Sequence, residues 1–220
     1  MNFFAVYLDA IIFRFHNNEI QVRLKKRPAD VPSLPNELAL EGVLIDPKKD
    51  KTENDALNRL FEDKIGLTFS YSEQLHCYAN HHRDPRGFSL VVPYLCLVES
   101  TVNDEEGIWL DALSLINKKD DYLPFDHINL IKMGYQALLN KSSYSSLPLF
   151  LIEQPFKYSQ IRKVFEATLN KPQHKGVLRK RIIPLLDCIN PEDSDKRDAS
   201  LYKRKNDEVY YFNTVSKGLN

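Results

Sequence analysis

The chain has 220 residues, of which 43% are hydrophobic and 11% aromatic, a composition that excludes a disordered protein and allows one large domain or two small ones. Its formal net charge is zero, but residues 150–220 carry 14 lysines and arginines against 9 acidic residues, and the remaining residues carry 16 against 21. Such an asymmetry is compatible with an acidic domain joined to a nucleic-acid-binding domain, and equally with ordinary surface variation.

The sequence indicates neither a membrane protein nor a disulfide-rich one. No apolar run reaches the roughly 18 residues of a membrane span, and Asp9 and Arg14 interrupt the apolar start of the chain, which we expect to be a strand rather than a signal peptide. Cys77, Cys96 and Cys188 are widely spaced and form no CxxC pair. We therefore expect a protein of the reducing cytoplasm with no membrane partner, no metal and no bound cofactor.

Strands dominate the first hundred residues. Period-two alternation on either side of the turn His16–Asn18 predicts a hairpin, and further short apolar runs predict additional strands; the predicted strands cover residues 7–15, 19–27, 38–46, 74–79 and 88–100. Gly42 interrupts the third of these. Pro93 lies inside the last one, where a missing N–H favours an edge position or a bulge.

Between these strands, residues 52–66 carry the pattern of an amphipathic helix. Thr52 and Asp55 form a capping signature at its start, apolar residues follow at helical spacing, and Gly66 is the expected stop. Leu60, Asp63 and Lys64 are expected to share one face of this helix. That face could be the remains of a metal site, a phosphate contact or a plain solvated surface.

The second half of the chain is mostly helical. Residues 107–116 predict a strand running into a short helix, 126–141 an amphipathic helix, 157–170 a further helix, and 171–186 a short basic helix ended by Pro184. The last predicted element is a pair of strands within residues 200–212, around the turn Lys205–Asp207. This order is that of a winged helix-turn-helix. A Ser-rich junction at 142–148 predicts two domains, 1–146 and 147–220.

Several motifs together resemble a known family. The segment 41–67, "HRDPRGFSLVVPY" at 82–94, Trp109 and "FDH" at 125–127 are similar to a Nudix domain, and the segments 156–182 and 196–203 are similar to a winged helix. The combination resembles the Nudix-related, NrtR-like transcriptional regulators. The resemblance implies an α/β Nudix-type sandwich with a mixed sheet, followed by a winged helix-turn-helix domain. It also implies repression of genes of NAD or sugar metabolism.

The Nudix box of hydrolases is degenerate in this chain. Such enzymes hold Mg²⁺ with several carboxylates, mostly on one helix. Aligned on Gly66, the box arginine falls at Arg59, but Lys51, Leu60 and Lys64 stand where three of its four glutamates belong, and only Asp63 keeps a carboxylate. The leading glycine, Gly42, is out of register. Lysines repel a divalent cation, so we expect a Nudix scaffold without its metal site and without hydrolytic activity.

Five residues are expected to bind the effector. The "RDPRG" stretch lies beside the ligand pocket in the resembling family, and arginines fork onto phosphates; the candidates are Arg27, Lys64, Arg83, Asp84 and Arg86. Each has a plainer alternative: a polar turn bent by Asp84-Pro85, a solvated Lys64 and a surface Arg27. Trp109 is expected in the core, and Asp126 is expected to act as a helix N-cap.

The basic helix is the element that we expect to bind DNA. Its cations have the pattern of an element that enters a major groove, with Leu178 and Ile182 on the core side; the DNA-binding candidates are Lys175, Arg179, Lys180, Arg181 and, on the wing, Lys196 and Arg197. Gly176, Val177 and Asp198 depart from the family pattern and predict an altered target sequence or affinity. A basic surface that binds no DNA is the alternative.

Taken together, these features predict a DNA-binding transcriptional regulator whose partners are double-stranded DNA and a nucleotide or sugar-phosphate effector similar to ADP-ribose. A homodimer is expected, because helix-turn-helix proteins commonly read two half-sites. Two other readings remain: a Nudix hydrolase that uses Asp55, Glu62 and Asp63, and a protein-interaction module whose winged helix binds another protein.

The degenerate box gives a direct prediction. Purified protein incubated with Mg²⁺ and ADP-ribose releases no product, because the box supplies one carboxylate where a diphosphate-bound metal needs several. Product release is measured by phosphate or nucleotide chromatography. Robust turnover that is lost in Asp63→Ala would contradict the prediction.

Overall fold

The strands of the first half form one mixed sheet. The computed structural model describes residues 4–31, 33–81, 83–190 and 200–212. Eight strands make up the sheet: β1 (Ala5–His16), β2 (Glu19–Lys26), β3 (Leu38–Ala39), β4 (Glu41–Leu44), β5 (Tyr71–Gln74), β6 (Tyr78–Asn80), β7 (Ser89–Leu97) and β8 (Ile108–Asp111). The main order is β3-β2-β1-β7-β5, with β1 and β7 parallel.

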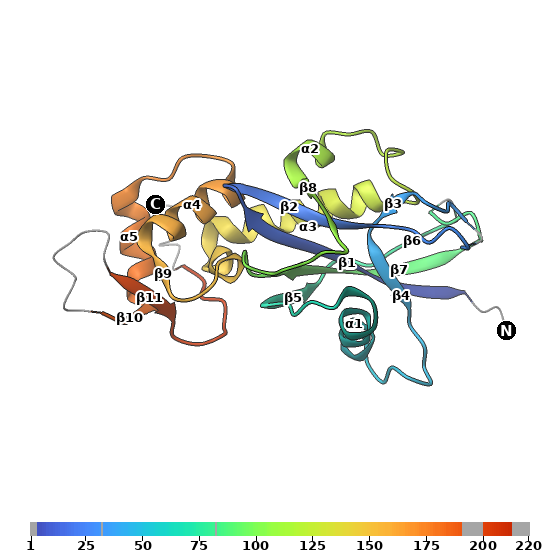
Figure 1. Ribbon diagram of the computed structural model, residues 1–220, viewed down its shortest axis with the longest axis horizontal. Coiled ribbons are helices and arrows are strands. Elements are labelled where there is room, and N and C mark those ends of the chain that lie inside the picture. Colours follow the sequence, from blue (N-terminus) through green and yellow to red (C-terminus); the bar gives the residue numbers. More distant parts are fainter. Residues whose placement is uncertain (1–3, 32, 82, 191–199, 213–220) are drawn as a thin grey trace, which may run out of the picture.

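Strand β1 organises both faces of this sheet. On one side β1 pairs with β7, and on the other its first half pairs with β4 and its second half with β2. Alternate side chains point to opposite faces, as the period of a strand requires. Leu8 and Ile12 pack against helix α1 (Glu53–Leu60), whereas Ile11 and Phe13 pack against helix α3 (His127–Tyr144). The sheet is therefore covered on both faces (Figure 1).

Helix α1 begins as the sequence predicts. Thr52 and Asp55 form a reciprocal capping box, and Gly66 ends the segment with a φ of 71°. The last turn differs from the prediction, because residues Phe61–Ile65 form a π-helix (η1) in which Gly66 N donates to Phe61 O at 2.8 Å. Leu60 is fully buried while Asp63 is exposed, so the expected common face of Leu60, Asp63 and Lys64 does not exist.

The C-terminal region forms the predicted winged helix-turn-helix. Its elements are β9 (Phe156–Lys157), α4 (Tyr158–Leu169), α5 (Lys175–Ile182), β10 (Leu186–Cys188) and β11 (Leu201–Arg204). Asn170, with φ at 48°, ends α4 and starts the turn. Leu178 and Ile182 are buried, which confirms them as the core side of α5. The three strands form a small sheet in the order β10-β11-β9.

The predicted hairpin within residues 200–212 is wrong. Strand β11 pairs instead with β10, at the register Leu186↔Arg204. Among the described residues after Asp207, Tyr211 forms an isolated bridge with Ser145 and no further strand is present. The local alternation of residues 208–212 resembled a strand, but those residues are used to contact the end of α3.

Of the two positions predicted for Pro93, the edge strand is wrong, whereas a bulge is present: between the pairs Gln74↔Tyr94 and Tyr78↔Val91, residues 75–77 lie opposite only residues 92 and 93. Strand β7 is interior, with β1 on one side and both β5 and β6 on the other. Leu75 N donates to Pro93 O, which shows that the backbone polar groups of Pro93 face the break between β5 and β6. The missing N–H therefore falls where no strand partner is paired. The predicted strand 74–79 is split by the same break.

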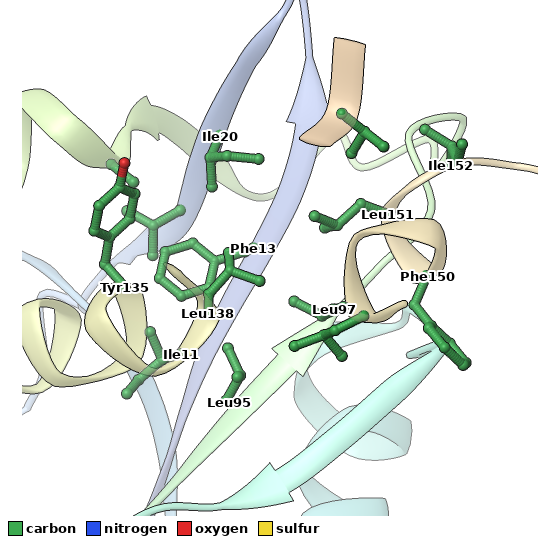
Figure 2. Packing of buried hydrophobic residues seen from close by; sticks show 14 of the residues in the cluster. Ile11, Phe13, Ile20, Leu95, Leu97, Tyr135, Leu138, Phe150, Leu151 and Ile152 are labelled. Carbon is green, nitrogen blue, oxygen red and sulfur yellow. The ribbon is translucent and has the colours of Figure 1, made fainter. Parts of the chain in front are cut away.

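Two short helices lie in the connections that follow β8 and α3. Helix α2 (Ala112–Ile116) follows β8, and the 3-10 helix η2 (Leu147–Leu151) follows α3. Phe150 and Leu151 belong to the same buried cluster as Ile11 and Phe13 of the sheet, so the hydrophobic core is continuous between the sheet and the winged helix (Figure 2). We propose a division into domains 1–146 and 147–220, although the two share this core. Within the described residues, no helix is long and apolar enough to cross a membrane.

Candidate functional site

A cationic pocket lies beside the start of α3. Its volume is about 210 Å³, and segments that are far apart in the sequence form its wall. The residues that line it are Tyr7, Asp9, Arg27, Leu40, Gly42, Leu44, Lys64, Arg83, Asp84, Arg86, Phe125 and His127. All five effector-binding candidates from the sequence are among them. The structure therefore brings together residues from positions 27 to 86, and their role in ligand binding stays a prediction.

Hydrogen bonds fix the guanidinium groups of Arg27 and Arg86 and use two of the three nitrogens of each. Arg27 donates Nε to Leu34 O at 3.0 Å and Nη2 to Ser33 O at 2.9 Å, and Arg86 donates Nε and Nη2 to the carboxylate of Asp84. Among the described residues, neither Nη1 has an acceptor. Such fixed guanidinium groups are ready to bind a phosphate or carboxylate without further ordering.

The same two arginines flank an aromatic ring. The guanidinium carbon of Arg27 lies 4.9 Å from the ring centre of Phe125, and that of Arg86 lies 5.8 Å from Phe125 and 5.2 Å from Tyr7. Cations over aromatic faces are attracted to them. Burial, followed by the charge of Arg86, lowers the pKa of Arg27 below its usual range. An anion bound between the two arginines would relieve their mutual repulsion.

Asp84 holds Arg86 in place. Its carboxylate accepts hydrogen bonds from both the backbone N–H and the side chain of Arg86. Burial alone would raise the pKa of Asp84, but these hydrogen bonds hold it below its usual range. Asp84 therefore orients Arg86, and we keep it in the site as a positioning residue.

Arg83 is engaged in a buried ion pair. Its Nε and Nη2 donate to the two oxygens of Asp126 at 3.0 and 3.1 Å, and its Nη1 donates to Ser89 Oγ at 3.0 Å. Both partners are nearly inaccessible to solvent. The prediction that Asp126 caps α3 through its side chain is wrong: Asp126 occupies the N-cap position without a capping hydrogen bond, because Arg83 takes both of its oxygens.

The remaining candidate, Lys64, contacts the backbone at the mouth of the pocket. Its Nζ donates to Gly42 O at 2.9 Å, and burial lowers its pKa. Lys64 also lines a neighbouring cavity of about 570 Å³ that contains Lys25, Glu41 and Asp63. The two cavities share Arg27, Leu40, Gly42 and Lys64.

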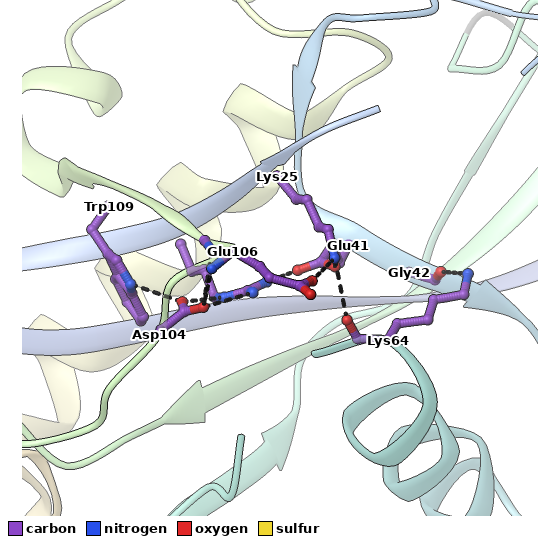
Figure 3. A network of polar contacts seen from close by, with 9 residues as sticks. Lys25, Glu41, Gly42, Lys64, Asp104, Glu106 and Trp109 are labelled. Carbon is purple, nitrogen blue, oxygen red and sulfur yellow. Dashed lines mark hydrogen bonds and ion pairs between the residues drawn. The ribbon is translucent and has the colours of Figure 1, made fainter. Parts of the chain in front are cut away.

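Basic side chains occupy the neighbouring cavity. Lys25 Nζ lies 2.5 Å from Glu106 Oε2, 3.4 Å from Lys64 O and 3.7 Å from Glu41 Oε1, as Figure 3 shows. Glu41 also pairs with the buried Arg23, which donates in turn to Asp104. Two carboxylates of this cavity, Glu41 and Glu106, are thus paired with lysine and arginine. No group of three or more metal-binding side chains occurs within the described residues.

The other Nudix-box positions have structural roles. Leu60 lies in the core beneath the sheet, and Lys51 is exposed. Arg59 donates to both oxygens of Asp50, and this hydrogen bonding lowers the pKa of Asp50 to about 2. The arginine that matches the box therefore fixes the loop before α1. Trp109, expected in the core, is only partly buried: its Nε1 donates to Asp104 and Arg14 lies over its ring.

The DNA-binding candidates of α5 lie on or beside its exposed face. Lys175, Lys180 and Arg181 are exposed, whereas Arg179 is half-buried over the ring of Tyr158. Helical geometry places Lys180 opposite Leu178 and Ile182, together with Val177, whose side chain is 50% exposed. Lys196, Arg197 and the departure at Asp198 lie outside the described residues.

Several pocket residues were not found by sequence reasoning. Asp9, Tyr7 and Phe125 line the pocket, and so does His127, whose Nδ1 accepts from the backbone N–H of Leu40 at 3.0 Å. A signal existed for Asp9, since it is a charged residue within the apolar strand 5–16. Phe125 carries none, because its place in the pocket depends on a backbone φ of 58°.

Comparison with known proteins supports this arrangement over the whole chain. No protein-family model matches the sequence. The ADPR responsive transcriptional repressor NtrR of Acinetobacter baylyi is 28% identical over 205 residues, which covers 89% of this chain and 80% of that protein. The crystal structure of Shewanella oneidensis NrtR superposes with a TM-score of 0.79 at 27% identity, covering 94% of this chain and 97% of that one.

The chain is similar to NrtR over nearly its whole length.

Two further structures of Shewanella oneidensis NrtR are similar to this chain. One is complexed with a 27mer DNA and superposes with a TM-score of 0.77 at 27% identity, covering 91% of this chain and 93% of that one. The other is its Nudix domain complexed with ADP ribose, with a TM-score of 0.53 at 25% identity, covering 63% of this chain and 90% of that one. The chain therefore has the Nudix and winged-helix fold predicted from its sequence.

The two arginines of the RDPRG stretch are expected to differ in their contribution to stability. Arg83→Met leaves the buried carboxylate of Asp126 without its partner and lowers the free energy of unfolding by about 3–5 kcal/mol. Arg86→Met removes a half-exposed guanidinium from the buried carboxylate of Asp84, which keeps its hydrogen bond from Arg86 N, and lowers the free energy of unfolding by less, about 1–3 kcal/mol. Urea denaturation of both variants measures the difference. Equal stability of the two variants would show that the Arg83–Asp126 pair does not hold the structure together.

Proposed function

We propose that this protein is a DNA-binding transcriptional regulator whose Nudix domain binds ADP-ribose, or a closely related sugar nucleotide, without cleaving it. The observation that carries the proposal is the pair of cavities joined at Arg27 and Lys64, on a chain that ends in a winged helix with a basic exposed face. The relatives support it, since one is named ADPR responsive and the other has been crystallised with ADP ribose and with DNA.

The shape of the joined cavities suits a two-part ligand. A sugar nucleotide such as ADP-ribose has a ribose at each end of a diphosphate bridge. The cavities of about 210 and 570 Å³ would each take one end, and the shared cations Arg27 and Lys64 would lie beside the bridge. Arg86 adds a third cation from the smaller cavity. Guanidinium and ammonium groups bind phosphate oxygens through charge-assisted hydrogen bonds.

The same cavities are poorly suited to hydrolysis. A Nudix hydrolase uses carboxylate-bound metal to neutralise the diphosphate and activate water. Here the acidic groups of the larger cavity are Glu41, Glu62, Asp63 and Glu106, of which Glu41 and Glu106 are paired with Lys25. The ammonium groups would balance the charge of the diphosphate without activating any water. Binding without turnover is what a sensor requires.

The exposed face of α5 supports DNA binding. Lys180 and Arg181 would neutralise phosphates or contact base edges in a major groove, and the exposed Val177 would offer an apolar contact of the kind that recognises a thymine methyl group. The half-buried Arg179 is a candidate for a backbone contact beside them. We propose a homodimer that acts on DNA in the cytoplasm, because winged helices commonly read paired half-sites.

Helix α3 offers a physical route between the two functions. It starts next to Phe125 and Asp126 at the pocket and ends at Tyr144, where Phe212 N donates to Tyr144 O at 2.7 Å. The ring of Phe212 lies 5.8 Å from the guanidinium carbon of Arg181 on α5. A cavity of about 550 Å³ separates the β1–β2 turn from α4, which leaves room for the winged helix to shift. A ligand that prefers one arrangement would change DNA affinity.

Promoter binding tests the DNA-binding part of the proposal. Wild-type protein is expected to bind fragments upstream of its own and neighbouring genes, with an affinity that falls steeply as salt rises, because phosphate contacts release counterions. Lys180→Ala/Arg181→Ala is expected to weaken binding at least about tenfold and to reduce the salt slope by about one for each lost phosphate contact. Gel shifts at several salt concentrations measure both quantities.

The control is Lys48→Ala/Lys49→Ala, which removes the same charge from the exposed β4–α1 connection. This variant is expected to bind like wild type. A wild-type protein that binds no promoter fragment, or binds equally at all salt concentrations, would contradict a DNA partner and favour a protein-interaction module.

A further inference from the structure

The smaller cavity contains a buried carboxylate that the interactions described so far do not explain. Asp9 lies in the middle of β1, on the face of the sheet that α3 covers, and only 7% of the residue is exposed. Its neighbours in the strand, Leu8 and Ala10, are buried in the core. A carboxylate taken out of water at such a position is costly unless something else binds it.

Within the described part of the chain, Asp9 accepts no hydrogen bond. The nearest cationic atom is Arg83 Nη2, 3.6 Å from Asp9 Oδ2, and that nitrogen already donates to Asp126. His127 Nε2 is 3.9 Å away, too far for a hydrogen bond. Since His127 Nδ1 accepts from Leu40 N, the ring proton is on Nε2 and faces Asp9 across this gap. Asp9 thus has charge neighbours but no donor in contact.

The backbone makes room for this carboxylate. Asp9 pairs with Gly42 in the β1–β4 register, and a Cβ atom built on Gly42 would lie 2.0 Å from Asp9 Oδ1. Any side chain at position 42 would therefore displace the carboxylate. Gly42 borders both cavities, whereas Asp9 lines the smaller one. Gly42, which interrupts a predicted strand in the sequence, thus leaves the space that the carboxylate of Asp9 occupies.

We propose that Asp9 accepts a hydrogen bond from a sugar hydroxyl of the ligand, and that the pocket therefore selects phosphorylated sugars over bare phosphates. The inference rests on the proposed function, which places the diphosphate at Arg27 and Lys64. Cationic groups already lie near the carboxylate of Asp9, but no donor lies within hydrogen-bond distance of it in the described part of the chain. We therefore expect the ligand to supply a neutral donor. In a sugar nucleotide, the neutral donors beside a phosphate are ribose hydroxyl groups. A hydroxyl bound to a carboxylate makes a charge-assisted hydrogen bond.

The ionisation of Asp9 predicts that ligand binding depends on pH. Burial, only partly offset by Arg83, raises the pKa of Asp9 to about 7. The charged and titratable groups around it are Arg83, Asp84 and Arg86 of the β6–β7 connection, Arg27 after β2, Asp126 and His127 at the start of α3, and Lys64 of η1. Burial lowers the pKa of His127 to about 3, so this histidine stays neutral near pH 7. The diphosphate of ADP-ribose stays fully ionised in the same range.

The test is calorimetric titration of the full-length protein with ADP-ribose at pH 6 and pH 8. Wild type is expected to bind up to about tenfold more tightly at pH 8, because the ionised carboxylate is the better acceptor and forms as pH rises through 7. Asp9→Asn is expected to bind about five- to tenfold more weakly than wild type at pH 8, and to lose the pH dependence. Asp121→Asn, the same change at an exposed site between α2 and α3, is the control and is expected to match wild type.

Thermal melting shows whether Asp9→Asn is folded. A group with a raised pKa in the folded state stabilises only while protonated, so wild type loses stability as pH rises from about 4 to about 7, and Asp9→Asn is expected to be at least as stable at pH 8. A folded Asp9→Asn that binds ADP-ribose like wild type at both pH values would overturn the inference and leave the proposed function intact. A wild-type protein that binds no ADP-ribose at either pH would overturn both.

Discussion

The buried ion pair between Arg83 and Asp126 is the contact on which the arrangement of this protein depends. It joins the loop before β7 to the first turn of α3 through two parallel hydrogen bonds. Because α3 is a single helix of 18 residues, fixing its first turn also fixes the position of its far end. The pocket lies at the first end, beside Phe125 and His127, and the winged helix is attached at the other. One ion pair thus sets the geometry of both.

Lysine side chains line the larger cavity, where the proposed function places the diphosphate. A hydrolase of this fold uses carboxylates to bind metal against a diphosphate. In this chain Lys25 lies among carboxylates and a carbonyl oxygen, and Lys64 bonds to Gly42 O at the edge shared by both cavities (Figure 3). Ammonium groups balance phosphate charge but do not activate water. Under the proposed function, these lysines would bind the ligand without cleaving it, as a regulator requires.

Local patterns predicted most of the elements, because their causes are local. The capping box of Thr52 and Asp55, the stop at Gly66 and the core side of α5 all follow from residues within a few positions of one another. The errors arose where the conformation of a segment depends on residues that are distant in the sequence. Pro93 fits an interior strand only because β5 and β6 leave a break beside it, and residues 208–212 are used by the end of α3 rather than by a hairpin.

The candidate site shows the same division. The five candidates named from the sequence line one pocket, since motif and charge were enough to find them. Their individual tasks could not be read from the sequence: Arg83 and Arg86 are three positions apart, yet one is buried in an ion pair and the other faces the cavity. Asp9 and Phe125 come to the pocket only through strand register and an unusual backbone angle. Tertiary geometry assigns these roles.

Coupling between the pocket and the winged helix is the central claim of this account. The most direct measurement is the affinity of the protein for a promoter fragment, by fluorescence anisotropy, with and without saturating ADP-ribose. For wild type the account predicts a change of about five- to 150-fold, and for Arg27→Met/Arg86→Met, at the same ADP-ribose concentration, almost none. An equal affinity for DNA with and without ADP-ribose, in a wild-type protein shown to bind both, would contradict it.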